Sequence, residues 1–277
     1  MRTRAGVSAL PPEQAPLSPL PGSVTGMCGR YVSVKSTSNL LDEFDAVDET
    51  DGASTKHGYN VAPTTGIRIV VNRVPHGAPE EETEPVKQLR LARWGLVPSW
   101  AKDLSVGNRM FNARAESVPE KSAFSKAFAR RRCLVPADGW YEWKKITNAE
   151  GKPGKQAYLM VPRDGHSLAF AGLYEFWKPK DDPEADWLTS VTILTAAAQG
   201  ELAEIHERMP LVLARDDWAR WLDPAQDGPT TLLQPRDEAA VESLELRPVS
   251  SKVNSVSNNG PELLERAEPE PASQALF

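Results

Sequence analysis

The chain has 277 residues, of which 40% are hydrophobic and 25% are charged, and its formal net charge is -6. This composition is typical of a folded globular protein. No run of about 18 apolar residues occurs, so we expect neither a membrane-spanning helix nor a membrane partner. The two cysteines and four histidines form no CxxC or HxxxH pair, so we expect no metal site. The low cysteine count fits a reducing cytoplasm.

The first 26 residues precede an internal Met27 in the stretch TGMCGRYVS (25–33). Their run VSALPPEQAPLSPLPGSV has five prolines and no apolar segment long enough for a secretory signal. We expect residues 1–26 to be disordered. Either they form a leader that is removed, or translation begins at Met27. We favour the second, because nothing in the leader resembles a cleavage segment.

Periodicity predicts mostly strands after this leader. A capped helix is expected within 33–49, a loop and strand within 59–74, a hairpin tip or insertion at 76–85, a strand with one wet face at 86–98 and a long loop at 99–117. There follow an amphipathic helix at 119–132, a strand broken by a turn at 133–145, three strands at 156–162, 167–177 and 187–198, a helix at 214–223 and a strand at 244–250. The sum predicts an α+β fold on a curved or barrel-like sheet with flanking helices. We expect one domain over 27–260 and a disordered acidic tail over 261–277.

The basic residues concentrate in one part of this acidic chain. Residues 86–132 hold eleven Lys/Arg and only three Asp/Glu. Such a segment is either a phosphate-binding face or a solvated charged surface, and charge alone favours the second.

Cys28 has two different chemistries, depending on where the mature chain begins. As the first residue it carries an α-amine with a reference pKa of about 7.7–8.0 and a thiol with one of about 8.5. An amine and a thiol on adjacent carbons condense with an aldehyde to a thiazolidine, which an internal cysteine cannot do. The alternative is a buried structural cysteine.

Three further patterns hold candidate functional residues. In FNARAES (111–117) alternate positions carry Asn112, Arg114 and Glu116, and the first two suit a sugar-phosphate. Glu142 lies between two aromatic residues, where desolvation would raise its pKa for proton transfer. His206 could shuttle protons near neutral pH. Alternatively, each of these side chains is an ordinary surface or core residue.

The stretch RWGLVPSWA holds two tryptophans beside Arg93. Aromatic side chains next to basic ones can stack on unpaired bases. Core packing is the alternative for Trp94 or Trp100, and we favour it for at least one of them.

The order of the motifs is more specific than any one of them. MCGRY, YNVAPT, RWGLVPSWA, NARAE, RRCLVPADGWYEW, IHERMP and PVSSKVN follow one another from residue 27 to about 260. Together they resemble the SOS response-associated peptidase family, the abasic-site processing proteins. The family's cysteine directly follows its initiator Met, whereas 26 residues precede Met27 here.

The resemblance implies a β-rich domain with a positively charged groove that binds single-stranded DNA containing abasic sites. It implies a covalent thiazolidine between N-terminal Cys28 and the ring-opened sugar aldehyde, with lyase-like chemistry and self-processing peptidase activity. It implies no cofactor, and we expect a cytoplasmic monomer, nucleoid-associated in a bacterium. The implied catalytic residues are Cys28, Asn112, Glu142 and His206, and the implied DNA-binding residues are Arg30, Trp94, Arg114, Thr195 and Arg208.

Two readings compete with this one. The first is a thiol peptidase acting on other proteins, with Cys28 as nucleophile and His206 as base, which needs no free N-terminus. The second is a non-catalytic binder of single-stranded DNA that uses the basic residues and the tryptophans.

Overall fold

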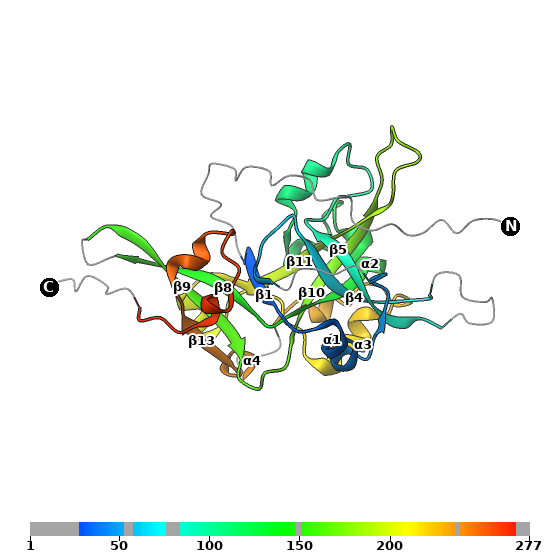
Figure 1. Ribbon diagram of the computed structural model, residues 1–277. Helices are drawn as coiled ribbons and strands as arrows, with labels where there is room; N and C mark the ends of the chain where they lie inside the picture. Colours follow the sequence, from blue (N-terminus) through cyan, green and yellow to red (C-terminus); the bar gives the residue numbers. More distant parts are fainter. Residues whose placement is uncertain (1–27, 53–57, 76–83, 148–150, 236–238, 270–277) are drawn as a thin grey trace.

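The computed structural model describes residues 28–52, 58–75, 84–147, 151–235 and 239–269 (Figure 1). Strands dominate, as predicted. The strands are β1 (Arg30–Ser33), β2 (Val47–Asp48), β3 (Gly58–Val61), β4 (Gly66–Arg73), β5 (Val86–Trp94), β6 (Asn112–Arg114), β7 (Arg132–Ala137), β8 (Gly139–Thr147), β9 (Pro153–Pro162), β10 (Leu168–Trp177), β11 (Leu188–Ala197), β12 (Arg208–Pro210) and β13 (Leu244–Pro248). The α-helices are α1 (Thr37–Phe44), α2 (Ser125–Arg130), α3 (Trp218–Leu222) and α4 (Ala239–Glu242).

The larger sheet closes on itself. Its strand order is β12-β11-β10-β7-β4-β5-β2, and β5 pairs back onto β11 in parallel. Strands β11, β10, β7, β4 and β5 therefore form a closed ring, which confirms the predicted barrel-like sheet. Both faces of the ring are apolar: Ile69 and Val71 of β4 pack into one core cluster, and Val70 between them packs into another.

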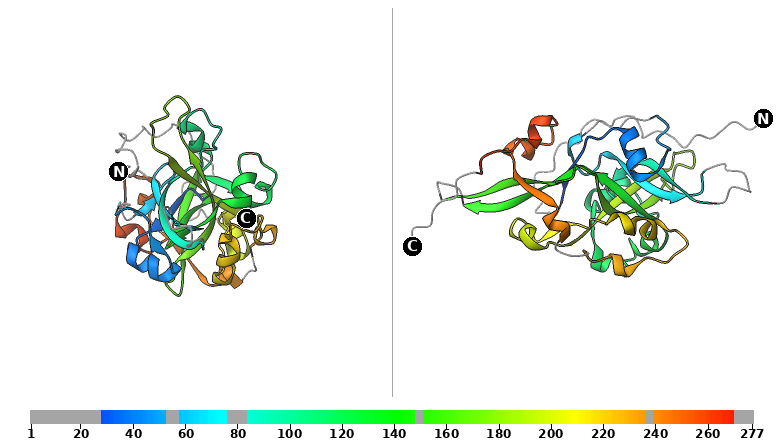
Figure 2. Two further views of the ribbon diagram at one scale, coloured as in Figure 1. Left: turned by 90° about the vertical axis from the view of Figure 1, so that its right-hand side faces the viewer. Right: turned by 90° about the horizontal axis from the view of Figure 1, so that it is seen from below.

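The second sheet has the order β13-β9-β8-β1-β3 and is antiparallel throughout. Its β8–β9 hairpin projects from the body of the molecule, which is clearest in the right-hand view of Figure 2. Strand β1 lies between β8 and β3, and it carries Cys28 at its N-terminal side. Cys28 contacts both sheets, through Glu142 of β8 and Arg208 of β12.

Helices α1, α2 and α3 pack against the larger sheet, and α4 packs against β13 of the smaller one. The Ser36 hydroxyl caps α1 by accepting from the backbone N–H of Asn39. Leu40 and Phe44 of α1 are buried, and the ring of Phe44 stacks on that of Trp218 with centroids 4.5 Å apart. The predicted helix over 119–132 is wrong in extent, since only 125–130 is helical and its N-terminus has no side-chain cap.

The expected disorder from residue 261 onward is wrong for residues 261–269. They include a 3₁₀ turn, Pro261–Leu264, whose Leu263 is fully buried. Arg266 forms a β-bridge with Val249 and an ion pair with Glu245 at 2.6 Å. The leader 1–26, most of the predicted insertion 76–85 and the last eight residues lie outside the described residues. None of the described helices is long and apolar enough to cross a membrane.

Candidate active site

The main-chain nitrogen of Cys28 lies against a buried carboxyl group. Pairing of β1 with β8, Arg30 opposite Tyr141, brings the start of β1 beside Glu142. The Cys28 N–H donates to Glu142 Oε1 at 2.8 Å, and the two residues are each only 4% exposed. The Cys28 φ of 35° is left-handed, a conformation that strains a residue with a side chain and is found at functional sites.

Burial sets the protonation of this pair. It raises the pKa of Glu142 to about 7, although nearby His206 and hydrogen bonds from Cys28 act in the opposite direction. Burial also raises the pKa of the Cys28 thiol, and the adjacent Glu142 charge raises it further. Near neutral pH the carboxyl can therefore give or take a proton, while the thiol remains protonated. The predicted raised pKa of Glu142 is confirmed.

Asn112 holds the other side of Cys28. Strand β6 runs parallel to β11, with Asn112 opposite Ile193, and this pairing brings the amide into the site. Its Nδ2 donates to the Cys28 carbonyl oxygen at 3.1 Å. Glu142 and Asn112 thus fix both ends of the Cys28 main chain. The predicted alternation reaches only to Arg114, since Glu116 lies in the 3₁₀ turn Ala115–Ser117.

His206 and Arg208 complete the site. The backbone N–H of Arg208 donates to His206 Nδ1 at 3.1 Å, which leaves the proton of the neutral imidazole on Nε2. The Arg208 carbonyl lies 3.2 Å from the same Nδ1 and 3.8 Å from the Cys28 sulfur, so it can accept from the imidazolium and from the thiol. His206 is close enough for its charge to lower the pKa of Glu142.

The guanidinium of Arg208 is held by protein groups. Its Nη1 and Nη2 donate to the two carboxylate oxygens of Glu116 at 2.7 and 2.9 Å, and Nη2 also donates to the Thr195 carbonyl. Thr195 is fully buried, and its carbonyl oxygen accepts from Arg208. The structure therefore does not support the predicted contact between Thr195 and a phosphate.

Arg30 is likewise held. Its guanidinium donates to the Val253 carbonyl at 2.6 Å and to the Asn254 carbonyl and Asn60 Oδ1, each at 3.1 Å. It also lies 5.6 Å from the ring centroid of Trp143, whose indole N–H donates to Asn254 Oδ1.

Arg114 differs from these two arginines. Its side chain is exposed, and none of the described residues hydrogen-bonds it. Of the predicted phosphate contacts, Arg114 is therefore the one whose side chain can bind a ligand without first breaking contacts to the protein.

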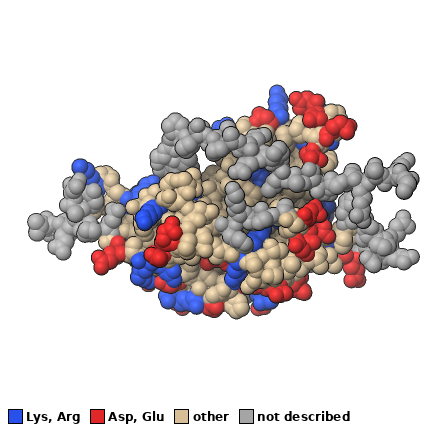
Figure 3. All heavy atoms as spheres, in the orientation of Figure 1, with Lys and Arg blue, Asp and Glu red and all other residues tan. Residues whose placement is uncertain are grey.

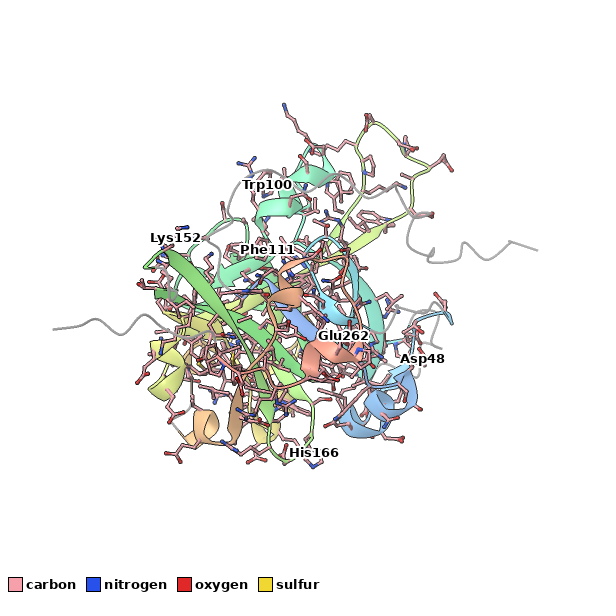
Figure 4. The ribbon with its side chains drawn as sticks, turned by 60° about the vertical axis from the view of Figure 1, so that its left-hand side comes forward. Asp48, Trp100, Phe111, Lys152, His166 and Glu262 are labelled. Carbon is pink, nitrogen blue, oxygen red and sulfur yellow. The ribbon has the colours of Figure 1, made fainter. Side chains whose placement is uncertain are left out.

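The predicted stacking of bases on Trp94 is wrong in this structure because the indole is sealed in the core. Trp94 is 0% exposed, donates to the Phe111 carbonyl at 2.8 Å and packs edge-on against Tyr31. Trp100 of the same motif is 56% exposed. Figure 4 shows it on the outer side of its loop, with Phe111 nearer the centre.

Part of the basic segment 86–132 is neutralised by acidic residues from elsewhere in the chain. Four of its eleven basic side chains form ion pairs: Lys87–Asp45, Arg90–Glu49, Arg130–Asp227 and Arg131–Glu175. On the face in Figure 3, acidic and basic side chains are interspersed over the described residues. The described residues contain no group of three or more His, Cys, Asp or Glu side chains that could hold a metal ion.

Sequence reasoning missed two contributors to the site. Glu116 was noted for its spacing but not as the partner of Arg208, and Asn60 was not singled out. Asn60 lies in YNVAPT, is 6% exposed, and donates through Nδ2 to three carbonyls of the segment 253–258. An asparagine inside a strand was the available signal, since this residue type is depleted in strands.

The family model of the SOS response associated peptidase (SRAP) matches residues 27–256. The chain belongs to this family. It is 35% identical over 242 residues to "Abasic site processing protein YoqW" of Bacillus subtilis, covering 86% of this chain and 99% of that protein. It is 30% identical over 241 residues to "Abasic site processing protein HMCES" of Xenopus tropicalis, covering 77% and 68%.

A crystal structure of a Bacteroides thetaiotaomicron protein matches this SRAP fold with a TM-score of 0.71. The match covers 87% of this chain and all of the other at 21% identity. It confirms the β-rich α+β fold.

Proposed function

We propose that this SRAP chain processes abasic sites in DNA, the activity for which its relatives are named, and that Cys28 reacts as the first residue of the mature chain. The observation that carries the proposal is the 2.8 Å contact between the Cys28 main-chain nitrogen and the buried carboxyl of Glu142. An α-amine at that position would lie beside a proton acceptor, on the carbon adjacent to the one that carries its own thiol.

Burial favours the reactive form of that amine. Two opposite charges in a dry pocket lose their hydration, so a neutral amine beside a neutral carboxylic acid is favoured over the ion pair. Glu142 would take the proton of the α-ammonium and return it later to a leaving oxygen. His206, with its proton on Nε2, is the second acid for opening the deoxyribose ring.

The crosslink then forms in two steps. The amine adds to the C1′ aldehyde, and the carbinolamine loses its hydroxyl as water with a proton from Glu142, which leaves an imine. The thiol sulfur adds to the imine carbon and its proton goes to the nitrogen, closing the thiazolidine. One water leaves overall. The hydrogen bond from Asn112 to the Cys28 carbonyl holds the amine and thiol in place.

The same residues support self-processing of a chain that begins before Cys28. The thiol would add to the carbonyl carbon of Met27, and the carbon–nitrogen bond would break. Glu142, hydrogen-bonded to that nitrogen, would take the thiol proton and pass it on. Water would hydrolyse the thioester and free the α-amine. The left-handed φ of Cys28 supports a strained scissile position.

The thiol peptidase that acts on other proteins is less well supported. A nucleophilic thiolate needs cationic surroundings that lower its pKa. Burial and Glu142 raise the pKa of the Cys28 thiol, and Arg208 offsets them only in part. We further propose single-stranded DNA as substrate, with exposed Arg114 as a phosphate contact, and a monomer acting in the cytoplasm.

The test compares three proteins on single-stranded DNA with one abasic site. Wild type is expected to give a heat-stable adduct. Cys28→Ser, produced from a start at Met27 so that removal of the initiator Met leaves residue 28 first, keeps the amine but loses the thiol. It should give only an imine, which needs borohydride for trapping. The third protein, a chain in which residue 28 remains internal, has no α-amine at this residue and should give neither adduct. Heat-stable crosslinking by Cys28→Ser would overturn the thiazolidine mechanism, and lack of an adduct with processed wild type would overturn the proposed function.

A further inference from the structure

The ion pair between Arg208 and Glu116 has no part in the chemistry proposed above. Both carboxylate oxygens of Glu116 accept from the end of the guanidinium, at 2.7 and 2.9 Å. The Arg208 side chain is 12% exposed and that of Glu116 is 41% exposed. A surface carboxylate therefore covers a nearly buried cation at the edge of the active site.

The five N–H groups of the guanidinium show what remains for a ligand. Two donate to Glu116 and one to the Thr195 carbonyl. The Nε–H is buried and has no partner among the described residues, so a ligand in solvent cannot reach it. One N–H on Nη1 is left. A phosphodiester can therefore make a two-point contact with Arg208 only by replacing the carboxylate.

We propose that Glu116 is a specificity-determining residue whose carboxylate occupies the place of a DNA phosphate on Arg208 and is displaced when DNA binds. A carboxylate and a phosphodiester each carry one negative charge and both match the fork of the guanidinium. Competition between them weakens binding to DNA that offers only its backbone. A strand with an abasic site is retained because the covalent step follows. This inference rests on the proposed binding of single-stranded DNA.

The surroundings of Glu116 fit such an exchange. Hydrogen bonds from Arg208 hold the pKa of Glu116 below its usual value, and the charge of Arg114 lowers it further. The carboxylate thus remains ionised at neutral pH and is a true competitor for an anion. When it is displaced, it remains beside Arg114, which limits the cost of leaving Arg208.

The test measures affinity of the full-length chain for an intact single-stranded oligonucleotide at several salt concentrations. Glu116→Gln should bind about five-fold tighter than wild type, with a salt dependence steeper by about 0.7 in log–log slope for one added phosphate contact. Glu120→Gln is the matched control. It makes the same charge change at an exposed residue that has no ion pair among the described residues, and should change affinity less than two-fold.

Two further variants keep the test decisive. Glu116→Asp retains the charge but is too short for the two-point contact, and should also bind more tightly. In an Arg208→Gln background, Glu116→Gln should gain no more than Glu120→Gln does. If Glu116→Gln binds like the control or more weakly, Glu116 orients Arg208 and the inference is wrong. If wild type and all variants fail to bind, the proposed function fails with it.

Discussion

Arg132 and Glu142 are both charged side chains that are 4% exposed, yet their surroundings differ. Among the described residues, no carboxylate lies within hydrogen-bond distance of Arg132. Instead its five N–H groups donate to five backbone carbonyls, which belong to Phe128, Ala129, Trp221, Asp223 and Gln226. Four of these carbonyls lie at the C-terminal ends of α2 and α3, where helices leave their acceptors unsatisfied, and that of Gln226 lies in the turn after α3.

Glu142 is the opposite case. Among the described residues, the hydrogen bonds it accepts come from Cys28, and burial raises its pKa to about 7. A buried charge whose hydrogen bonds are all made stabilises the fold and is chemically inert. A buried charge whose hydrogen bonds are only partly made can change protonation. We therefore infer that Arg132 stabilises the fold and that Glu142 takes part in proton transfer.

The largest expected effect is that of a Glu142 substitution on the rate of crosslinking. Glu142→Gln removes the group that moves protons between amine, hydroxyl and solvent, and should slow crosslinking at least about 100-fold at pH 7. The rate is measured from adduct formed over time with abasic single-stranded DNA. Glu142→Asp is the control, since it keeps a carboxyl group and should retain part of the rate. A Glu142→Gln protein with more than half the wild-type rate would contradict the assignment.

Arg132→Met should change stability instead. It leaves five carbonyls without their donor, and the free energy of unfolding should fall by about 3–5 kcal/mol. Denaturant unfolding measures the change. Arg130→Met is the matched control, because Arg130 is 53% exposed and pairs with exposed Asp227, so the loss should be under about 1 kcal/mol. Equal losses in the two variants would remove the contrast drawn here.

The stability contribution of Glu142 should depend on pH. Folding raises the pKa of Glu142 from 4.5 to about 7, so the folded state loses stability as pH rises through that window. In a chain that starts at Met1, Cys28→Ala removes the thiol that self-processing needs and so keeps residue 28 internal. In that background, Glu142→Gln should raise the free energy of unfolding by on the order of 2 kcal/mol at pH 8 and leave it unchanged at pH 4. A gain of the same size at both pH values would exclude titration of Glu142.

The smallest effect concerns the two tryptophans of RWGLVPSWA. Trp94→Phe loses a buried indole and its hydrogen bond to Phe111, so stability should fall by about 1–2 kcal/mol while affinity for DNA stays the same. Trp100→Ala, at an exposed position, should change stability by less than about 0.5 kcal/mol. Loss of DNA binding without loss of stability in Trp94→Phe would restore the stacking role.

Local sequence predicted most strands because their patterns are local. The turn at Asp138 between β7 and β8, the cap at Ser36 and the alternation of β5 all follow from nearby residues. Closure of the barrel was expected only in outline, since the pairing of β5 with β11 joins segments about 100 residues apart. The end of the chain was misread because its polar composition hides Leu263, the residue that anchors it.

The sequence predicted part of the site. The raised pKa of Glu142 was predicted from its two aromatic neighbours, which do not fully account for it. Glu142 has the raised pKa expected of it, but side chains alternate along a strand, so its neighbours Tyr141 and Trp143 face away from it. The dry pocket comes from the packing of β1 and β8. Glu116 could not be assigned to Arg208 because 92 residues separate them and only the fold joins them.

The most direct test of the account is the intact mass of the full-length protein before and after incubation with an abasic single-stranded oligonucleotide. The account predicts a mass that begins at Cys28, and then a heat-stable species equal to protein plus oligonucleotide minus one water. A protein that begins at Cys28 and forms no such species would contradict it, as would a heat-stable adduct on a chain whose Cys28 remains internal.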